Sequence, residues 1–297
     1  MKCLFEGTGV AVVTPFKNGK VDYVAFRNLL KQVLENGAKA VIILGTTGEG
    51  STITNDERKE LIKLARYTIN IQAKLIVGTG NNNFETCKKN TKMAKDFCAD
   101  GVLVVTPYYN KTTQQGLIEY YTQLSEIGIP IIMYNVPSRT GLNIDTKTVA
   151  QLTNNEMIYG LKESSCDINR IVELSNVCKD KIALYSGEDN LNYVFYCLGA
   201  NGSISVTANV CADKVQRVYD LVSQGQFRQA KELQNELAEL NNALFIETNP
   251  IPVKTLMSHM GMIEKEVRMP LVSASKENES LLVKLAERLK QEKLIIN

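Results

Sequence analysis

The feature that most constrains the fold is an alternation of two patterns. Short runs rich in Val, Ile and Leu are each followed by a longer stretch with apolar residues at helical spacing. After the first run, for example, Phe26, Leu29 and Val33 lie on one face of a helix expected over residues 22–35, with Asp22 as its N-cap. The pattern is typical of βαβ units with buried parallel strands. The runs end near Thr14, Thr46, Gly78, Thr106, Tyr134, Lys162, Ser186 and Ser205.

Eight such units predict an α/β fold, a (β/α)8 TIM barrel, over residues 1–224. A doubly wound open sheet is the alternative, but it usually has fewer strands, and its glycine-rich phosphate fingerprint is missing here. Past residue 224 the strand-like runs stop, and apolar residues recur at helical spacing from Phe227 to Leu244. Residues 225–297 are therefore expected to form a C-terminal helical domain that packs against the barrel.

Composition excludes several classes of function. The 34 basic and 32 acidic residues are interspersed, so no nucleic-acid partner is expected. No apolar run approaches about 18 residues and no signal peptide is visible, so no membrane partner is expected. Seven scattered cysteines without a Cys-x-x-Cys pair favour a reduced, cytoplasmic protein. The chain has a single histidine, His259, which is expected near a helix end. One histidine excludes a multi-histidine metal site and argues against a Ser-His-Asp triad.

Lys162 stands where a buried strand should end. Alternate side chains of a strand share a face, so Ile158, Gly160 and Lys162 are expected to point into the barrel, with the amine at its rim. Burial there would favour the neutral amine, a nucleophile that can form a Schiff base with a carbonyl substrate. The alternative is a solvated lysine just past the strand, ion-paired with Glu163.

Other polar segments follow neighbouring strands and should reach the same rim. They bring tyrosine and threonine hydroxyls, backbone N–H groups and one arginine, Arg139, close to Lys162. Each alone could be an ordinary turn; together they suit a carbonyl substrate that carries a carboxylate. The segments are residues 45–49, 106–110, 134–141 and 186–189.

The motifs GTTGE, TPYYN, YNVPSRTG, GLKESS, YSGED and TNPIPVK occur in this order. In them the chain resembles the dihydrodipicolinate synthase family, the lysine-pathway branch of the pyruvate-dependent class I aldolases. GTTGE and the lysine strand are shared with relatives such as N-acetylneuraminate lyase and imply only Schiff-base chemistry on a 2-oxo acid. Residues 135–141, with Arg139, are the more discriminating element because an arginine suits a second substrate with a carboxylate.

The resemblance implies a lyase (synthase) that condenses pyruvate with L-aspartate 4-semialdehyde through a Schiff base on Lys162. The product would be 4-hydroxy-tetrahydrodipicolinate, in the diaminopimelate route of lysine biosynthesis. Tyr134 would shuttle protons, and Thr46 would connect it to Tyr109 of a neighbouring subunit. A homotetramer built as a dimer of dimers is therefore implied.

The substrate-binding residues are also implied by the resemblance. Thr46 and Thr47 would hold the pyruvate carboxylate, and Arg139 would pair with that of the semialdehyde. Main-chain groups of Gly187 and Ile204 would line the floor. No metal and no organic cofactor is expected, because the covalent lysine imine itself activates pyruvate.

Members of the family that lysine inhibits bind it in a cleft to which Asn82, Glu85 and Tyr108 correspond here. Where inhibited members often carry histidines, this chain has Asn55 and Arg58. An arginine beside a cationic ligand is repulsive, so feedback by lysine is expected to be weak or absent.

Two other functions stay open. A pyruvate-type aldolase acting on a sugar acid, similar to N-acetylneuraminate lyase, would use the same barrel and lysine. A non-catalytic barrel that senses a small acid would keep the fold without using Lys162 as a nucleophile.

Overall fold

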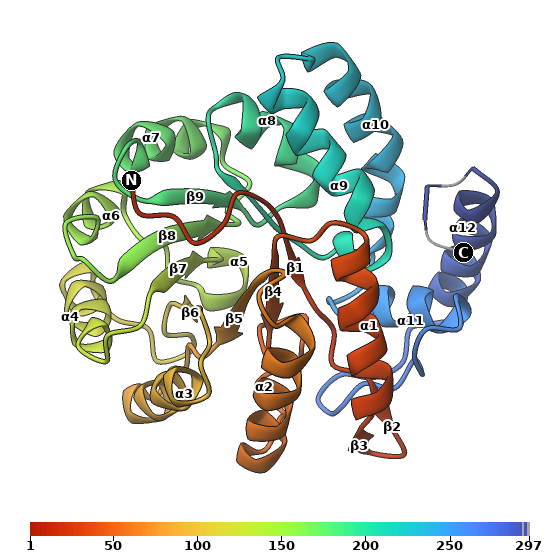
Figure 1. The fold of residues 1–297 in the computed structure, drawn as a ribbon, viewed down its shortest axis with the longest axis horizontal. Helices are drawn as coiled ribbons and strands as arrows, with labels where there is room; N and C mark the ends of the chain where they lie inside the picture. The colour runs from red at the N-terminus through yellow and green to blue at the C-terminus, as the bar shows by residue number, and fades with distance from the viewer. Residues whose placement is uncertain (293, 296–297) are drawn as a thin grey trace.

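The structure is a computed structural model that describes residues 1–292 and 294–295. Its centre is a closed barrel of eight parallel strands (Figure 1). The barrel closes because β1 pairs with both β4 and β10, so the predicted TIM barrel is confirmed and the open sheet is wrong. The barrel strands are β1 (Gly7–Ala11), β4 (Ala40–Ile43), β5 (Lys74–Gly78), β6 (Gly101–Val105), β7 (Ile131–Asn135), β8 (Ile158–Glu163), β9 (Ala183–Ser186) and β10 (Gly202–Ser205).

Helices surround the barrel and cover its outer face (Figure 1). The buried strands separate two layers of core, as their period of two requires. In β4, Ala40 and Ile42 pack inside the barrel, whereas Val41 and Ile43 pack against the helices. The helices after the strands are α1 (Tyr23–Glu35), α2 (Asn55–Ile69), α3 (Phe84–Asp96), α4 (Gln114–Ser125), α5 (Pro137–Thr140), α6 (Thr146–Leu152), α7 (Ile168–Cys178), α8 (Asn192–Cys197) and α9 (Ala208–Ser223).

The N-cap predicted at Asp22 is present. Asp22 accepts hydrogen bonds from the N–H groups of Val24 and Ala25, at the start of α1. Thr54 and Glu57 form the reciprocal capping box of α2. Three short features were not expected: the hairpin of β2 (Phe16–Lys17) with β3 (Lys20–Val21), the short helix α5, and the 3₁₀ turn η1 (Asp189–Leu191).

The ends of some strands differ from the expectation. Thr14 and Thr46 lie past the ends of β1 and β4, in loops above the barrel. In β8 a register shift places Ile158 opposite Ile131 and Gly160 opposite Ile132, so Tyr159 is an extra residue in the strand. The bulge turns Ile158 outward, into the core between barrel and helices. The prediction that Ile158 shares a face with Gly160 and Lys162 is therefore wrong at Ile158.

The C-terminal part is helical: α10 (Phe227–Ala243), α11 (Ile251–His259) and α12 (Lys276–Gln291). His259 ends α11, as expected, and lies 3.3 Å from Glu279 of α12. A boundary between domains at residues 224 and 225 stays a prediction, because α11 and the segment before it contact the loop after β4 through side chains described below. None of the described helices is both long and apolar enough to span a membrane.

Candidate active site

Lys162 lies in β8 with only 6% of its surface exposed. Its partner across the sheet is Tyr134 of β7, and the Lys162 Nζ lies 4.2 Å from the centre of the Tyr134 ring. Gly187, directly after the end of β9, packs against it. A Cβ at this glycine would lie 2.7 Å from Lys162 Cε and 2.0 Å from Ser164 Oγ, so any larger residue would displace the lysine. The amine is therefore fixed by backbone and an aromatic ring.

Glu163, the next residue, faces the opposite side of β8 and is completely buried. It accepts hydrogen bonds from Arg170 Nε at 3.0 Å, Asn135 Nδ2 at 2.9 Å and the Ser165 N–H at 2.8 Å. These donors hold the end of β8 against α7. The alternative in which Lys162 is a solvated partner of Glu163 is thus wrong, because the two side chains lie on different faces.

Lys162 opens into a cavity of about 150 Å³. Six of the residues predicted from the sequence line it together, and they come from different strands and loops: Thr46, Thr47, Tyr134, Arg139, Lys162 and Gly187. Parallel strands in a barrel bring their carboxyl ends to one rim, which explains why residues so distant in sequence converge here.

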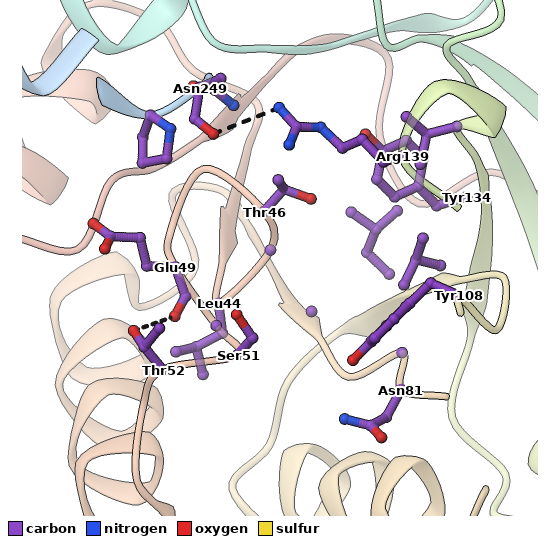
Figure 2. Close-up of a pocket in the computed structure, with 18 of the residues that line it drawn as sticks. Leu44, Thr46, Glu49, Ser51, Thr52, Asn81, Tyr108, Tyr134, Arg139 and Asn249 are labelled. Carbon is purple, nitrogen blue, oxygen red and sulfur yellow. Dashed lines mark hydrogen bonds between the residues drawn. The ribbon is translucent and has the colours of Figure 1, made fainter. Parts of the chain in front are cut away.

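A larger cavity of about 310 Å³ shares Thr46, Tyr134 and Arg139 with the first one. Figure 2 shows these side chains, with Tyr108 and Asn81 further along the same wall. The site of Lys162 is therefore one end of a longer cleft, and the cleft continues outward between the loops that follow β4, β5 and β6.

The C-terminal part contributes to the loop that carries both threonines. Asn249 Nδ2 donates to Thr47 Oγ1 at 2.9 Å, and its carbonyl lies 3.5 Å from Arg139 Nη2 (Figure 2). Below the loop, Lys254 Nζ of α11 lies 2.6 Å from Glu49 Oε1, and both side chains are buried. This ion pair was missed from the sequence, because the motifs that end at Glu49 and at Lys254 give no sign that the two residues pair.

Two predicted site residues do not join the others within one chain. Tyr109 is 91% exposed, has a φ of +68°, and lines neither of the two cavities. Ile204 is buried in the barrel interior and also lines neither cavity.

The residues proposed to bind lysine are spread along the outer cleft. Tyr108 lines the larger cavity, whereas Asn82 and Glu85 do not. Arg58 does line it, is only 6% exposed, and donates to the carbonyls of Gly78 and Gly50 at 3.1 and 2.8 Å. Burial lowers the pKa of its guanidinium. Asn55 is exposed at the start of α2 and lines neither cavity.

Sequence reasoning assigned no role to Glu188, which lines the cavity of Lys162. Its Oε2 accepts a hydrogen bond from Cys166 Sγ at 3.4 Å. Burial, with a smaller contribution from the charge of Asp189, raises the pKa of this carboxyl, whereas the charge of Lys162 opposes the rise. The available signal was its position directly after Gly187 in the motif YSGED. Within the described residues, no cluster of three or more His, Cys, Asp or Glu side chains could hold a metal ion.

Comparison with known proteins agrees with this geometry. The profile of the Dihydrodipicolinate synthetase family matches residues 4–289. The chain belongs to this family. It is 45% identical over 280 residues to the 4-hydroxy-tetrahydrodipicolinate synthase of Clostridium novyi, covering 94% of this chain and 95% of the relative. With the enzyme of Alkaliphilus oremlandii, identity is 43% over 98% of this chain and 100% of the relative.

Solved structures lead to the same family. The dihydrodipicolinate synthase of Thermotoga maritima superimposes with a TM-score of 0.94 at 39% identity, over 98% of this chain and 99% of that one. The enzyme of Aquifex aeolicus gives a TM-score of 0.94 at 42% identity, over 99% and 100%. The resemblance seen in the motifs is thereby confirmed, and with it the prediction that the chain is a lyase of the class I aldolase type.

Proposed function

We propose that this chain is a 4-hydroxy-tetrahydrodipicolinate synthase, which condenses pyruvate with L-aspartate 4-semialdehyde in lysine biosynthesis. The observation that carries the proposal is the setting of Lys162. Its amine is buried at the barrel rim, and in the described part of the chain no carboxylate oxygen lies within 4.0 Å of it. It shares a small cavity with the Tyr134 phenol and the Arg139 guanidinium, in a chain whose relatives carry that name.

Lys162 attacks the keto carbon of pyruvate, water leaves, and an imine forms. Loss of a proton from the pyruvate methyl group then gives an enamine, whose carbon attacks the aldehyde of the second substrate. Tyr134 serves as the proton donor and acceptor, a role supported by its place beside Lys162 in the lining of the same cavity. The lysine imine is the electron sink, so the scheme uses no metal and no organic cofactor.

Hydroxyl and N–H groups of Thr46 and Thr47 hold the pyruvate carboxylate. Thr47 is fixed for this task by its hydrogen bond with Asn249, whereas Thr46 is exposed toward the cavity. Arg139 pairs with the carboxylate of the semialdehyde through its planar fork. Gly187 lines the floor beside Lys162, and the backbone of Ile204 lies deeper in the barrel.

Tyr109 completes the proton relay from a neighbouring copy of the chain within a tight dimer, and two such dimers form a homotetramer. A tyrosine that is 91% exposed and held in the left-handed region of φ supports this role, because such a side chain gains from a partner surface. Light scattering of the purified protein, with Tyr109→Phe as a kinetic probe, tests the assignment. We also propose that the enzyme is cytoplasmic and that lysine inhibits it only weakly.

The proposed function is tested by trapping the imine. Borohydride added with pyruvate should increase the intact mass by one reduced pyruvyl group, and Lys162→Ala should give no adduct. Product formation with aspartate semialdehyde, compared with sugar-derived aldehydes, then separates the synthase from a sugar-acid aldolase. Absence of an adduct in the unmodified protein would favour a non-catalytic sensor.

A further inference from the structure

The second substrate of the proposed function presents two charges beside its aldehyde. It is an α-amino acid, so it carries a carboxylate and an ammonium group. Arg139 accounts for the carboxylate. The ammonium also needs a partner in the cavity, and it must lose a proton before its nitrogen can act as a nucleophile in ring closure.

Glu188 is the one carboxylate among the described residues that line the cavity of Lys162. The other ionisable side chains along this wall are Lys162, Tyr134 and Arg139. Glu188 directly follows Gly187, whose backbone packs on Lys162 Cε. The cavity therefore has one acidic group close to the amine that forms the imine, and one arginine in the same lining.

The position of Glu188 is fixed by its backbone, and its side chain is only partly engaged. Ser186 Oγ accepts from the Glu188 N–H at 3.3 Å and donates to its carbonyl at 3.0 Å. Among the described residues the side chain accepts a hydrogen bond from the weak donor Cys166 Sγ, and the backbone N–H of Asn190 also lowers its pKa. Within the described residues no lysine or arginine nitrogen lies within 4.0 Å of this carboxylate. It is thus free to bind a cation that enters the cavity.

We propose that Glu188 binds the ammonium group of aspartate semialdehyde opposite Arg139 and accepts its proton during ring closure. The inference rests on the proposed function and adds a catalytic residue to it. The paired charges match a zwitterionic amino acid, and a sugar acid, which lacks the ammonium, would leave Glu188 without a partner. Partial burial also raises the pKa of this carboxyl above its ordinary value, which makes the carboxylate a stronger proton acceptor.

The proton balance of the step requires an acceptor. After carbon–carbon bond formation, Lys162 holds the adduct as a protonated imine, and the substrate nitrogen is an ammonium. Glu188 takes one proton, and the resulting amine attacks the imine carbon. The attack opens the C=N double bond to Lys162 and gives a tetrahedral carbon bonded to both nitrogens. Collapse of this intermediate breaks the remaining C–N bond to Lys162. The lysine leaves as an ammonium after receiving the two remaining protons of the substrate nitrogen. One proton is left on Glu188, which returns it to water.

The test compares two ligands in the variant Glu188→Gln. Aspartate semialdehyde carries the ammonium, whereas 4-oxobutanoate has the same chain, aldehyde and carboxylate without it. We expect kcat/KM for the semialdehyde to fall by about 10- to 100-fold, because a charge-assisted contact and a base are both lost. The inhibition constant of 4-oxobutanoate against the semialdehyde should change by less than about twofold, since that ligand does not contact Glu188 through a charge.

A mass spectrum after borohydride treatment separates binding from ring closure. With both substrates present, the Glu188→Gln protein should accumulate the acyclic adduct of both substrates on Lys162, because the step after carbon–carbon bond formation is slowed. Glu173→Gln, an exposed glutamate in α7 that lines neither cavity, is the control for charge removal and should behave as the unmodified enzyme.

Equal loss for both ligands, or no loss for either, would overturn the proposal. If Glu188→Gln fails to trap pyruvate, its fold or lysine environment is damaged, and Glu188→Asp is used instead. That variant keeps the charge and should retain discrimination between the two ligands; loss of discrimination with intact pyruvate trapping would also refute the role. Failure of the unmodified enzyme to condense the semialdehyde would instead refute the proposed function.

Discussion

Lys162 and Lys254 share burial and an aromatic contact but differ in their partners. Each ammonium lies 4.2 Å from the centre of an aromatic ring, Tyr134 for Lys162 and Phe16 for Lys254. Lys254 Nζ lies 2.6 Å from Glu49 Oε1, whereas within the described residues no carboxylate lies within 4.0 Å of Lys162 Nζ. Burial and a nearby aromatic ring therefore do not distinguish a catalytic lysine from a structural one. The presence of a carboxylate partner distinguishes the two.

The pair of Lys254 and Glu49 connects α11 with the loop after β4. Glu49 has a φ of +49°, and its second oxygen accepts the backbone N–H of Arg268 at 2.9 Å. Burial lowers the pKa of Lys254, and the charge of Glu49 opposes this shift. A buried ion pair adds little stability over an apolar pair, but either ion left alone is costly. Lys162, in contrast, faces a cavity, and no described carboxylate lies within 4.0 Å of its nitrogen.

The largest effect is expected from Lys162→Met. Removing the amine removes the nucleophile, so turnover should fall by about 10⁴-fold or more. Because no described carboxylate loses a partner, the free energy of unfolding should stay within about 1 kcal/mol of its original value or rise. Kinetics and denaturant unfolding of one preparation check both statements. A loss of stability similar to that of a broken ion pair would remove the contrast between the two lysines.

Lys254→Met should give the opposite result in stability. The variant leaves Glu49 buried without its partner, which typically costs about 3–5 kcal/mol. Pyruvate trapping at Lys162 should persist at low temperature, while KM for pyruvate rises because Thr46 and Thr47 lie on the affected loop. Denaturant unfolding and pyruvate titration measure the two effects.

The double variant Lys254→Met with Glu49→Gln is the matched control. It removes both charges, so it should recover part of the stability lost in the single variant. No recovery would mean that the hydrogen bond from Arg268 to Glu49, rather than the ion pair, holds the loop.

The sequence predicts the barrel and most of the rim because both depend on local pattern. Strand and helix periods recur along the chain, and parallel strands bring Thr46, Tyr134 and Lys162 to one edge whatever the details of packing. The bulge at Tyr159 is not visible in a pattern of period two, because one inserted residue resembles ordinary variation. The outward turn of Ile158 follows from it.

Long-range pairing is the other part that sequence did not reveal. Glu49 and Lys254 are 205 positions apart, and nothing local distinguishes either from a solvated residue. Glu188 was overlooked for the same reason: its neighbour Gly187 was recognised, but only the fold places its carboxylate in the cavity of Lys162. Tyr109 shows a third limit, since its predicted role depends on a surface of another chain.

A smaller effect concerns Arg268, which also stacks on Phe16, at 4.3 Å from Cζ to the ring centre. Its guanidinium forms two hydrogen bonds with Glu57, at 2.8 and 2.5 Å, and these lower the pKa of that carboxyl to about 2. The folded pKa lies below the unfolded value of 4.5, so the stabilisation is present above pH 4.5 and is lost as pH falls toward 2. Arg268→Met should lose roughly 1–3 kcal/mol at neutral pH.

Unfolding free energies measured across this acid range test the assignment to Glu57. The difference between the original protein and Arg268→Met should shrink as the pH falls, because protonated Glu57 no longer needs the arginine. A difference that is independent of pH would assign the stability to the stacking on Phe16 instead. In that case a cation on the ring, paired or not, would be the stabilising element.

The smallest effect is expected from added lysine. Arg58 is another buried cation. Like Lys162, it lines a cavity and has no described carboxylate within 4.0 Å. A lysine ammonium near it would be repelled, so steady-state activity should change by less than about twofold at sub-millimolar lysine. Strong inhibition in that range would show that Tyr108 and the neighbouring backbone outweigh the repulsion.

The double variant Asn55→His with Arg58→His sharpens this last test. It removes the Arg58 charge from the larger cavity and leaves imidazoles that are largely neutral above their ordinary pKa. Inhibition by lysine should therefore become stronger as pH rises from about 6 to 8 in the variant, and stay weak in the original protein. If both proteins respond alike, the charge of Arg58 does not determine the response. A buried basic side chain at a cavity would then indicate chemistry only where, as at Lys162, its neutral form is a nucleophile.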